Sequence, residues 1–249
     1  MGVRMLLINP LGTDMFDGIT VELVQPHLAA DTEVVCRSLA GGVPRIPFLA
    51  PPASYHDPLV GAVAAAAGEG FDVVGISCCG DPALADCKAA SRIPVTAPME
   101  ATAAASTALG PVCIVQRKLP AVYAERMPTQ RDNTWMRDMM RRYGMPDERV
   151  DFRQVPVSEH PSPEEVTDMV ERDPDGLRER ILEAMAHAVD GPGIELTGQI
   201  AADGRASSVF FACTFWGGLL DNVRASTSLN VIDPLLVVAK YAEYLAVVS

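Results

Sequence analysis

Two cysteines stand in settings that suit acid–base chemistry. Cys78 follows the short apolar run Val73–Ile76, which predicts a buried strand and then a tight turn. A helix is expected to follow the turn, with Asp81 as its N-cap and Pro82 as its first residue. Backbone N–H groups and the dipole at a helix N-terminus favour a thiolate. Cys78 placed in this way would act as a base or nucleophile near neutral pH.

The surroundings of Cys78 recur around Cys213. When the two cysteines are aligned, the following pairs match without a gap: Leu84 with Leu219, Asp86 with Asp221, Ala90 with Ala225 and Ser91 with Ser226. After one inserted residue, Pro94 through Pro98 falls against Asn230 through Pro234. A cysteine chosen blindly is most often inert core. The recurrence indicates an internal duplication, and it favours a functional role for this pair.

Short apolar runs alternate with helical patterns along the chain. This alternation predicts βαβ units around parallel sheets, and the duplication favours two α/β lobes. Strands are expected at these positions: Arg4–Ile8, Thr32–Cys36, Val73–Ile76, Ile93–Thr96, Pro111–Gln116, Val150–Val155 and Val209–Ala212.

Side chains that follow the strands are placed like ligand donors, because open parallel sheets bind ligands outside the carboxyl ends of their strands. Asn9 and Thr13 follow the first strand, although Asn9 would equally well serve only to cap the turn. Arg117 follows the strand Pro111–Gln116, and its planar fork suits a substrate carboxylate. The alternative for Arg117 is a solvated side chain.

Two aromatic residues come directly after the second cysteine turn. Phe215 and Trp216 lie two and three positions past Cys213, where we expect at least one ring to reach the ligand. Aromatic rings there would add apolar surface and narrow the space for substrate. The alternative is that Trp216 packs between the lobes.

Three other segments carry weaker signals. Residues 41–58 are rich in proline and predict a long loop of the kind that forms lids or binding walls, with Tyr55 to Asp57 near its end. A helix start at Asp57-Pro58 is the simpler interpretation there. Trp135–Tyr143 predicts an amphipathic helix with a solvated arginine face. A glycine-containing run from Asp190 to Ser207 leads into the next strand, and no helix is predicted in it.

Composition excludes several classes of partner. The net charge of −12 argues against nucleic acid or an anionic membrane, since both call for a basic patch. The six cysteines and four histidines show no metal-site spacing, so no metal is assigned and a reduced, cytoplasmic compartment is expected. No run approaches the roughly eighteen apolar residues of a membrane span, and no signal peptide is recognisable. We expect a small-molecule substrate and leave homo-oligomerisation open.

Taken together, the motifs resemble the aspartate/glutamate/hydantoin racemase superfamily, and the hydantoin racemase branch most closely. The residues that carry the resemblance are Ile8-Asn9-Pro10, Cys78 through Leu84, Glu100-Ala101, Ala108-Leu109-Gly110, Ile114-Val115, Arg142-Tyr143-Gly144, Ala212-Cys213-Thr214 and Val231 through Pro234. They span nearly the whole chain in the expected order.

The resemblance implies two pseudo-symmetric lobes, residues 1–98 plus 233–249 and residues 99–232, with the active site in the cleft between them. It also implies catalysis without a cofactor: one cysteine thiolate takes a proton from a carbon next to a carbonyl, and the other thiol returns one to the opposite face. The family pattern selects Cys78 rather than Cys79 as the catalytic residue of its pair. Backbone N–H groups of the two turns, which include Cys79, Gly80 and Thr214, would hold the enolate charge.

Departures from the branch put the substrate in question. Leu11 replaces a second asparagine, and Gln116-Arg117 replaces a common hydroxyl pair. Phe215-Trp216 replaces small residues. Two other functions therefore stay open. One is a sister reaction that relies on a single cysteine, such as malonate decarboxylation or cis–trans isomerisation. The other is a non-catalytic protein that binds a small ligand.

Overall fold

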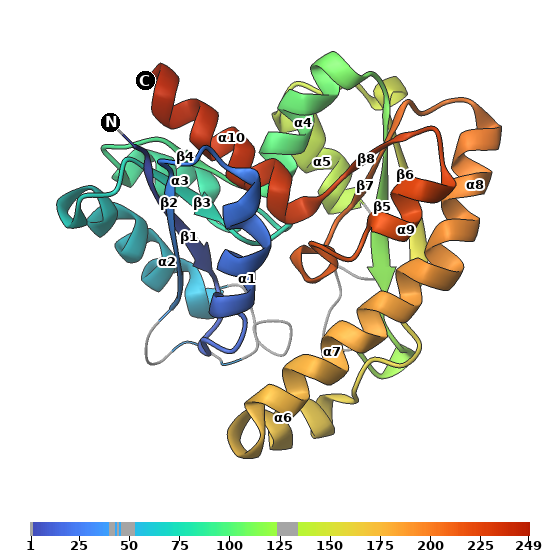
Figure 1. The fold of residues 1–249 in the computed structure, drawn as a ribbon, viewed down its shortest axis with the longest axis horizontal. Helices are drawn as coiled ribbons and strands as arrows, with labels where there is room; N and C mark the ends of the chain where they lie inside the picture. The colour runs from blue at the N-terminus through green and yellow to red at the C-terminus, as the bar shows by residue number, and fades with distance from the viewer. Residues whose placement is uncertain (1, 40–42, 44, 46–52, 124–133) are drawn as a thin grey trace. The chain divides into compact units, whose positions relative to one another are not determined.

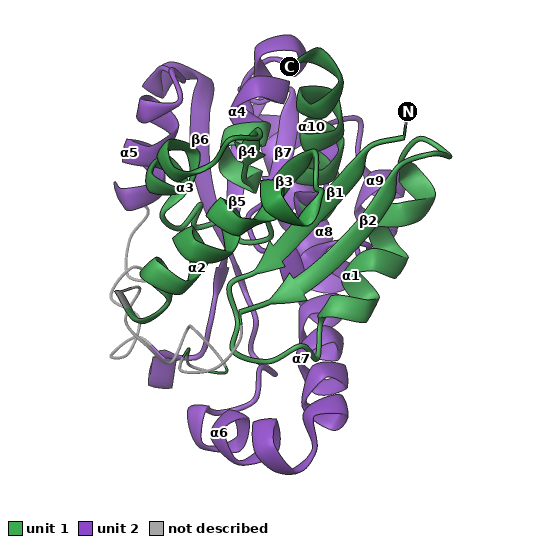
Figure 2. Ribbon diagram, turned by 90° about the vertical axis from the view of Figure 1, so that its left-hand side faces the viewer, with its two compact units in different colours: residues 1–101, 235–249 green, residues 102–234 purple. Residues whose placement is uncertain are grey.

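The computed structural model describes residues 2–39, 43, 45, 53–123 and 134–249. The chain forms two compact units, one of residues Met1–Ala101 with Leu235–Ser249 and the other of Thr102–Pro234 (Figure 2). Each unit contains one four-stranded sheet in which every pairing is parallel (Figure 1). The predicted α/β class, with two parallel sheets flanked by helices, is confirmed.

The sheet of unit 1 has the strand order β2-β1-β3-β4. Its strands are β1 (Arg4–Asn9), β2 (Glu33–Ser38), β3 (Val73–Ile76) and β4 (Val95–Thr96). The helices of this part of the chain are α1 (Asp17–Val24), α2 (Ala53–Ala66), α3 (Leu84–Ala90), the beginning of α4 (Pro98–Leu109) and α10 (Pro234–Val248), with 3-10 turns at η1 (Gln25–His27) and η3 (Ala67–Glu69).

Helix α10 packs on the core of unit 1. Its buried positions Leu235, Val238, Ala239 and Ala242 recur at helical spacing and form one apolar stripe. Leu235, Ala239 and Ala242 join the cluster of β-strand side chains that includes Met5, Leu7 and Val73. The helix lies close to the sheet at Gly75, where an added Cβ would come 3.3 Å from Val238 Cγ2. The last helix therefore completes the fold of the unit in which the chain begins.

The sheet of unit 2 has the equivalent order β6-β5-β7-β8. Its strands are β5 (Val112–Lys118), β6 (Val150–Pro156), β7 (Ser208–Phe211) and β8 (Asn230–Ile232). The helices are the remainder of α4, α5 (Thr134–Arg142), α6 (Pro163–Arg172), α7 (Pro174–Ala188), α8 (Ile194–Asp203) and α9 (Asp221–Ser226), with single turns at η4 (Ala121–Tyr123), η6 (Asp147–Arg149), the π-helical η7 (Val189–Gly193) and η8 (Thr214–Trp216).

The glycine-containing run before β7 is helical, which corrects the expectation that it holds no helix. Helix α7 continues through η7 into α8 (Figure 1). Pro192 lies inside η7. A proline ring clashes with the carbonyl four residues earlier in an α-helix, and the wider π turn avoids that clash. The next residue, Gly193, is also tightly placed, since a Cβ there would lie 3.0 Å from the Ala188 oxygen. Proline and glycine thus mark a bulge in this helix rather than its end.

Helices α2 and α5 bear on two other predictions, the helix start at Asp57-Pro58 and the arginine face of Trp135–Tyr143. Helix α2 begins at Ala53 and contains Pro58, so the predicted start at Asp57-Pro58 is wrong. Pro58 lies past the first turn of α2 and has no N–H, so the helical bond from residue 58 to the carbonyl of Ser54 is not formed. In α5 the methionines are buried, whereas Arg141 pairs with Asp138 and Asp147 on the exposed side, so the solvated arginine face is confirmed there.

Both sheets are built on one topology, as the repeat in the sequence predicted. Strand β3 pairs with β1 and β4, and β7 pairs with β5 and β8, all in parallel. Val74 lies opposite Val95 in one sheet, and Val209 lies opposite Val231 in the other. Within the described part of the chain, none of the helices has the length and apolar composition that crossing a bilayer requires.

Candidate active site

Cys78 lies in a strained turn directly after β3. Its N–H donates to Ile76 O at 2.9 Å, and Asp81 N donates to Cys78 O at 3.0 Å. Asp81 and Ala83 take positive φ angles of 40° and 51°. The left-handed region costs a non-glycine residue about 1–2 kcal/mol. The surrounding fold must therefore hold this turn in place.

Asp81 is not the N-cap of α3, which corrects the sequence prediction. Helix α3 begins at Leu84 after Ala83, and no side chain caps it. The Asp81 carboxylate instead accepts hydrogen bonds from Met99 N at 3.0 Å and Glu100 N at 2.9 Å, in the first turn of α4. The N-cap position of α3 is taken by Ala83, whose side chain has no hydrogen-bonding group. Helix α3 therefore begins six residues after Cys78 rather than at Pro82, and no stabilisation of a Cys78 thiolate is assigned to its dipole.

The turn at Cys213 repeats this backbone arrangement in unit 2. Cys213 N donates to Phe211 O at 2.9 Å, and Trp216 N donates to Cys213 O at 2.9 Å. Leu219 N then bonds to Trp216 O at 3.0 Å, as Leu84 N bonds to Asp81 O at 3.3 Å in unit 1. After the turn, η8 ends at Trp216 and the next helix, α9, begins at Asp221.

These bonds restrict which turn N–H groups can contact a substrate oxygen. The N–H groups of Cys78 and Asp81 are used within the first turn, and those of Cys213 and Trp216 within the second. Because these four N–H groups already donate within the turns, they do not fit the predicted role of binding the negatively charged oxygen of the enolate.

Burial keeps three other thiols protonated, those of Cys36, Cys87 and Cys113. Desolvation, and secondarily Asp86, raises the pKa of Cys87 to about 11. Desolvation, with Asp151 next, raises the pKa of Cys113 to about 12. Burial and the charge of Asp17 raise the pKa of Cys36 still further. Because only the thiolate is a base, none of these three suits proton abstraction at neutral pH.

Asn9 is anchored by its amide nitrogen. This nitrogen donates to Asp17 Oδ1 at 2.7 Å and to Cys36 Sγ at 3.3 Å. Asp17 also accepts from the Ser38 N–H and hydroxyl, both at 2.7 Å, so it ties the ends of β1 and β2 to α1. Both N–H bonds of the Asn9 amide are used, and only its oxygen is left for a ligand. Thr13 lies half-buried between β1 and α1.

Gln116 occupies the same place in unit 2 as Asn9 in unit 1. Ile8 is level with Ile76 on the neighbouring strand, and Val115 is level with Phe211, so the two amides each follow the last paired residue. Gln116 is 4% exposed, and its Oε1 has no hydrogen-bond partner among the described residues. A buried acceptor left unpaired costs about 1–3 kcal/mol. This cost marks Gln116 as a candidate for contact with a ligand N–H group.

Each unit thus gathers its predicted residues at the carboxyl edge of its own sheet. Ser77 N bonds to Ile8 O at 2.8 Å, which sets Asn9 beside Cys78 at adjoining strand ends. Ala212 N bonds to Val115 O at the same distance, which sets Gln116 beside Cys213 in the same way. Cys78 is half-buried and Cys213 is buried, with Thr214 half-buried beside it.

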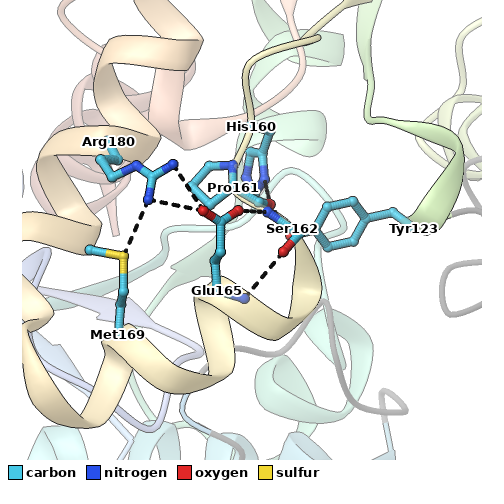
Figure 3. Close-up of polar contacts among 7 residues, drawn as sticks. All are labelled: Tyr123, His160, Pro161, Ser162, Glu165, Met169 and Arg180. Carbon is cyan, nitrogen blue, oxygen red and sulfur yellow. Dashed lines mark hydrogen bonds and ion pairs between the residues drawn. The ribbon is translucent and has the colours of Figure 1, made fainter.

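Arg117 lies near a buried histidine that the sequence did not single out. His160 is 5% exposed, and Arg117 and burial lower its pKa to about 4, with burial the larger cause. Its Nδ1 lies 3.0 Å from Pro161 O, which also accepts from the Tyr123 hydroxyl at 2.5 Å (Figure 3). A carbonyl only accepts, so the neutral ring carries its proton on Nδ1. Next along the chain, Ser162 and Glu165 form the capping box of α6 (Figure 3).

The structure uses Trp216 as a core residue, so we do not place it among substrate contacts. The indole is fully buried, and its Nε1 donates to Met185 O of α7 at 3.1 Å. Its ring stands edge-on to Phe211 at 5.4 Å between centroids. All three residues belong to unit 2. Of the two rings expected to include a ligand contact, this burial disfavours Trp216 and leaves the prediction to Phe215. Phe215 is half-buried.

Tyr55 of α2 lies within electrostatic range of the first cysteine. Burial raises its pKa to about 12, and the electrostatic influence of Cys78 adds to the effect. The phenol therefore keeps its proton and is available as a donor. Neighbouring His56 bridges Asp57 and Asp86 on the surface. The predicted lid comprises residues 41–58. Of these, residues 41, 42, 44 and 46–52 lie outside the described part of the chain.

Gly80 faces the Cys78 thiol, whereas Cys79 is buried at 5% exposure. A Cβ on Gly80 would lie 3.6 Å from Cys78 Sγ, which is ordinary van der Waals contact. Gly80→Ala should therefore fold normally yet crowd the sulfur, lowering kcat/KM about tenfold. Gly61→Ala, where an added Cβ meets nothing within 4 Å, is the matched control. Thermal unfolding and steady-state kinetics check both, and unchanged kinetics in Gly80→Ala would remove Gly80 from the site.

A model of one protein family matches nearly the whole chain. The match, to Asp/Glu/hydantoin racemases, covers residues 5–242. The chain belongs to the Asp/Glu/hydantoin racemase family. This membership confirms the predicted enzyme class, a racemase-type isomerase. Among curated proteins, none matches the sequence.

Solved structures of racemases share the fold of this family member. Allantoin racemase from Klebsiella pneumoniae aligns with a TM-score of 0.67 at 18% identity, covering 99% of this chain and 88% of that one. Allantoin racemase from Pseudomonas fluorescens gives 0.64 at 19% identity, with 98% and 90% covered. Glutamate racemase from Francisella tularensis gives 0.55 at 10% identity, with 98% and 81% covered.

Proposed function

We propose that this racemase works without a cofactor and uses Cys78 and Cys213 as paired base and acid. One thiolate takes the proton from a carbon next to a carbonyl, which leaves an enolate and a thiol. The other cysteine, as a thiol, gives its proton to the opposite face and becomes a thiolate. The substrate is inverted, and the two sulfurs have exchanged protonation states. Stereoinversion needs two such groups.

The observation that carries this proposal is the match between the two cysteine turns. Each follows the third strand of its unit, and each is closed by the same two hydrogen bonds, from the cysteine N–H and to the cysteine carbonyl. A sister reaction that relies on one cysteine gives no reason for two such turns. The raised pKa values of Cys36, Cys87 and Cys113 support the assignment, since they disfavour these three thiols as bases.

We further propose a hydantoin-type substrate, a flat ring with N–H groups and carbonyl oxygens. Asn9 offers only its side-chain oxygen, and the buried Gln116 Oε1 needs a donor. Acceptors suit ring N–H groups and repel the carboxylate of an amino acid. Arg117, the one cation among the predicted contacts, would take a carbonyl or carboxylate oxygen. The names of the two allantoin racemases point to the same substrate class.

A substrate panel tests this assignment. Deuterium uptake from heavy water at the α-carbon should be fastest for 5-substituted hydantoins, including allantoin, and at least about tenfold slower for aspartate and glutamate. Uptake and loss of optical rotation should proceed together. The assignment to hydantoins is wrong if aspartate or glutamate is the best substrate. Tight binding of a hydantoin without any uptake would instead favour the non-catalytic function.

Gln116→Leu separates a binding role from a structural one. Replacing a buried unpaired acceptor by an apolar side chain of similar size should leave stability unchanged or raise it by about 1 kcal/mol. The same change removes the acceptor for a substrate N–H and should lower kcat/KM on the hydantoin about tenfold. Thermal unfolding and kinetics measure the two effects, which have opposite signs. Gln154→Leu, on the paired residue of β6, is the control.

A further inference from the structure

A carboxylate fastens the Cys78 turn to the helix that follows the next strand. Asp81 lies within that turn and is 7% exposed. Its Oδ1 accepts from Met99 N at 3.0 Å, and its Oδ2 accepts from Glu100 N at 2.9 Å. Both donors belong to the first turn of α4. Asp81 also closes the turn through its own N–H, which donates to Cys78 O.

A carboxylate makes the equivalent connection in unit 2, from the opposite end. Asp233 lies between β8 and Pro234, the first residue of α10, and is 4% exposed. Its Oδ2 accepts from Gly218 N at 2.9 Å. Gly218 follows η8 in the Cys213 turn and has a φ of 75°, matching the left-handed Ala83 of the first turn.

The two carboxylates are not copies of one residue. In the alignment of the repeats, Asp81 falls against Trp216, and Asp233 falls against Ala97. In unit 1 the acid sits in the turn and the donors in the helix, whereas in unit 2 the acid precedes the helix and the donor sits in the turn. Two different residues thus make one connection. This indicates that the connection itself is what each cysteine turn needs.

We propose that Asp81 and Asp233 are positioning residues for the two thiols. Asp81 fixes the turn that aims Cys78, and Asp233 fixes the turn that aims Cys213. Charge-assisted hydrogen bonds to backbone N–H groups suit this task, because they are stronger and more directional than neutral ones. The proposal rests on the proposed function, which assigns catalysis to these two cysteines.

Asparagine at each position tests the connection, because it keeps the shape and removes the charge. Asp81→Asn should raise the rate of iodoacetamide alkylation at Cys78 about fivefold, since a looser turn exposes the sulfur and a nearby negative charge is gone. Alkylation of Cys213 should stay within about twofold. Asp233→Asn should reverse this pattern. Both should lower kcat on a hydantoin about tenfold and leave KM nearly unchanged.

Controls and a second variant separate positioning from loss of stability. Asp86→Asn changes an exposed acid that pairs with His56, and it should not alter alkylation of Cys78 or Cys213. Glycine adopts a positive φ without strain and has no carboxylate. Asp81→Gly therefore replaces Asp81→Asn if the asparagine variant unfolds. Mass spectrometry of each cysteine peptide gives the rates, and thermal unfolding is measured in parallel.

The outcome decides the proposal whatever the substrate is. Equal changes at Cys78 and Cys213 in both asparagine variants, or faster alkylation of buried Cys87 and Cys113 as well, would show general loosening and overturn it. Unchanged alkylation at the cysteine of the altered turn would also overturn it. If the wild-type protein turns over no hydantoin, the proposed function fails, and the alkylation pattern alone still tests the two connections.

Discussion

Replacing either Cys78 or Cys213 by serine should abolish racemisation, lowering kcat about a thousandfold or more, as expected for an acid–base group. Serine is close to cysteine in size, but its hydroxyl does not ionise near neutral pH. Each variant keeps one thiol and can still exchange the α-hydrogen of one enantiomer from its own side. The two variants should therefore retain deuterium uptake on opposite enantiomers.

The controls come from the buried thiols. Cys87→Ala and Cys113→Ala remove thiols whose raised pKa values, about 11 and about 12, keep them protonated. Both should keep turnover within about twofold of wild type if they remain folded. Polarimetry gives racemisation, and proton NMR in heavy water gives exchange for each enantiomer. Full racemase activity in Cys78→Ser or Cys213→Ser would contradict the two-base mechanism, and loss confined to one of them would favour a one-cysteine sister reaction.

The sheets could be predicted because their signals are local. The run Val73–Ile76 is β-branched, fully apolar and bounded by turn residues, and the structure places β3 at those same residues. The duplication was visible because a strand, a cysteine turn and a helix recur in the same order, with matched residues at nearly constant spacing. Its confirmation comes from the shared strand order and the parallel pairing of both sheets.

The errors occur where distant contacts override a local signal. Asp81-Pro82 has the residue types of a helix start, yet the Asp81 carboxylate is taken up by donors of α4, which lie far along the chain. Phe215-Trp216 resembled a binding surface, but α7 supplies the acceptor that draws the indole into the core. Neither partner can be read from the residues that surround these motifs. The positioning role proposed for Asp81 was hidden for the same reason.

Among the residues of the candidate site, those with a local sequence signal were predicted and those defined by distant contacts were not. Cys78 and Cys213 were predicted from local context. Asn9 was predicted only as one of two alternatives, and its bonds to Asp17 and Cys36 show that it holds the strand end. His160 was missed, because nothing in its neighbouring residues distinguishes it from other loop residues. Asp233 was noticed only as part of the motif Val231 through Pro234, without a role. Only burial and bonding reveal their roles.

His160 should make the protein lose stability as the pH falls. The pKa of His160 is about 4 in the folded state and about 6.5 when exposed. Between these two pH values the imidazole is protonated in the unfolded chain and neutral in the folded chain. The stabilising effect of the neutral ring is fully present above pH 6.5 and is lost as the pH falls toward 4. One pKa unit corresponds to about 1.4 kcal/mol, so the loss should be about 2 kcal/mol at pH 5.

The geometry around His160 gives the physical reason for this penalty. The ring stands edge-on to Tyr123, with centroids 5.3 Å apart, and its Nδ1–H donates a hydrogen bond to Pro161 O (Figure 3). A second proton would place a charge in this buried cluster, where the cation of Arg117 already opposes it. Burial is the larger of the two causes.

His160→Phe isolates the effect from the titration of the acidic residues. The variant keeps an aromatic ring against Tyr123 but loses the bond to Pro161 O, which should cost about 1 kcal/mol at pH 7.5. Because phenylalanine does not titrate, its disadvantage relative to wild type should shrink and then reverse as the pH falls to 5. His187→Gln is the control of opposite sign, because Glu159 raises the pKa of that exposed histidine. Its contribution is present at low pH and lost as the pH rises. Urea unfolding at a series of pH values measures all three proteins, and parallel curves for wild type and His160→Phe would show that His160 is not the titrating group.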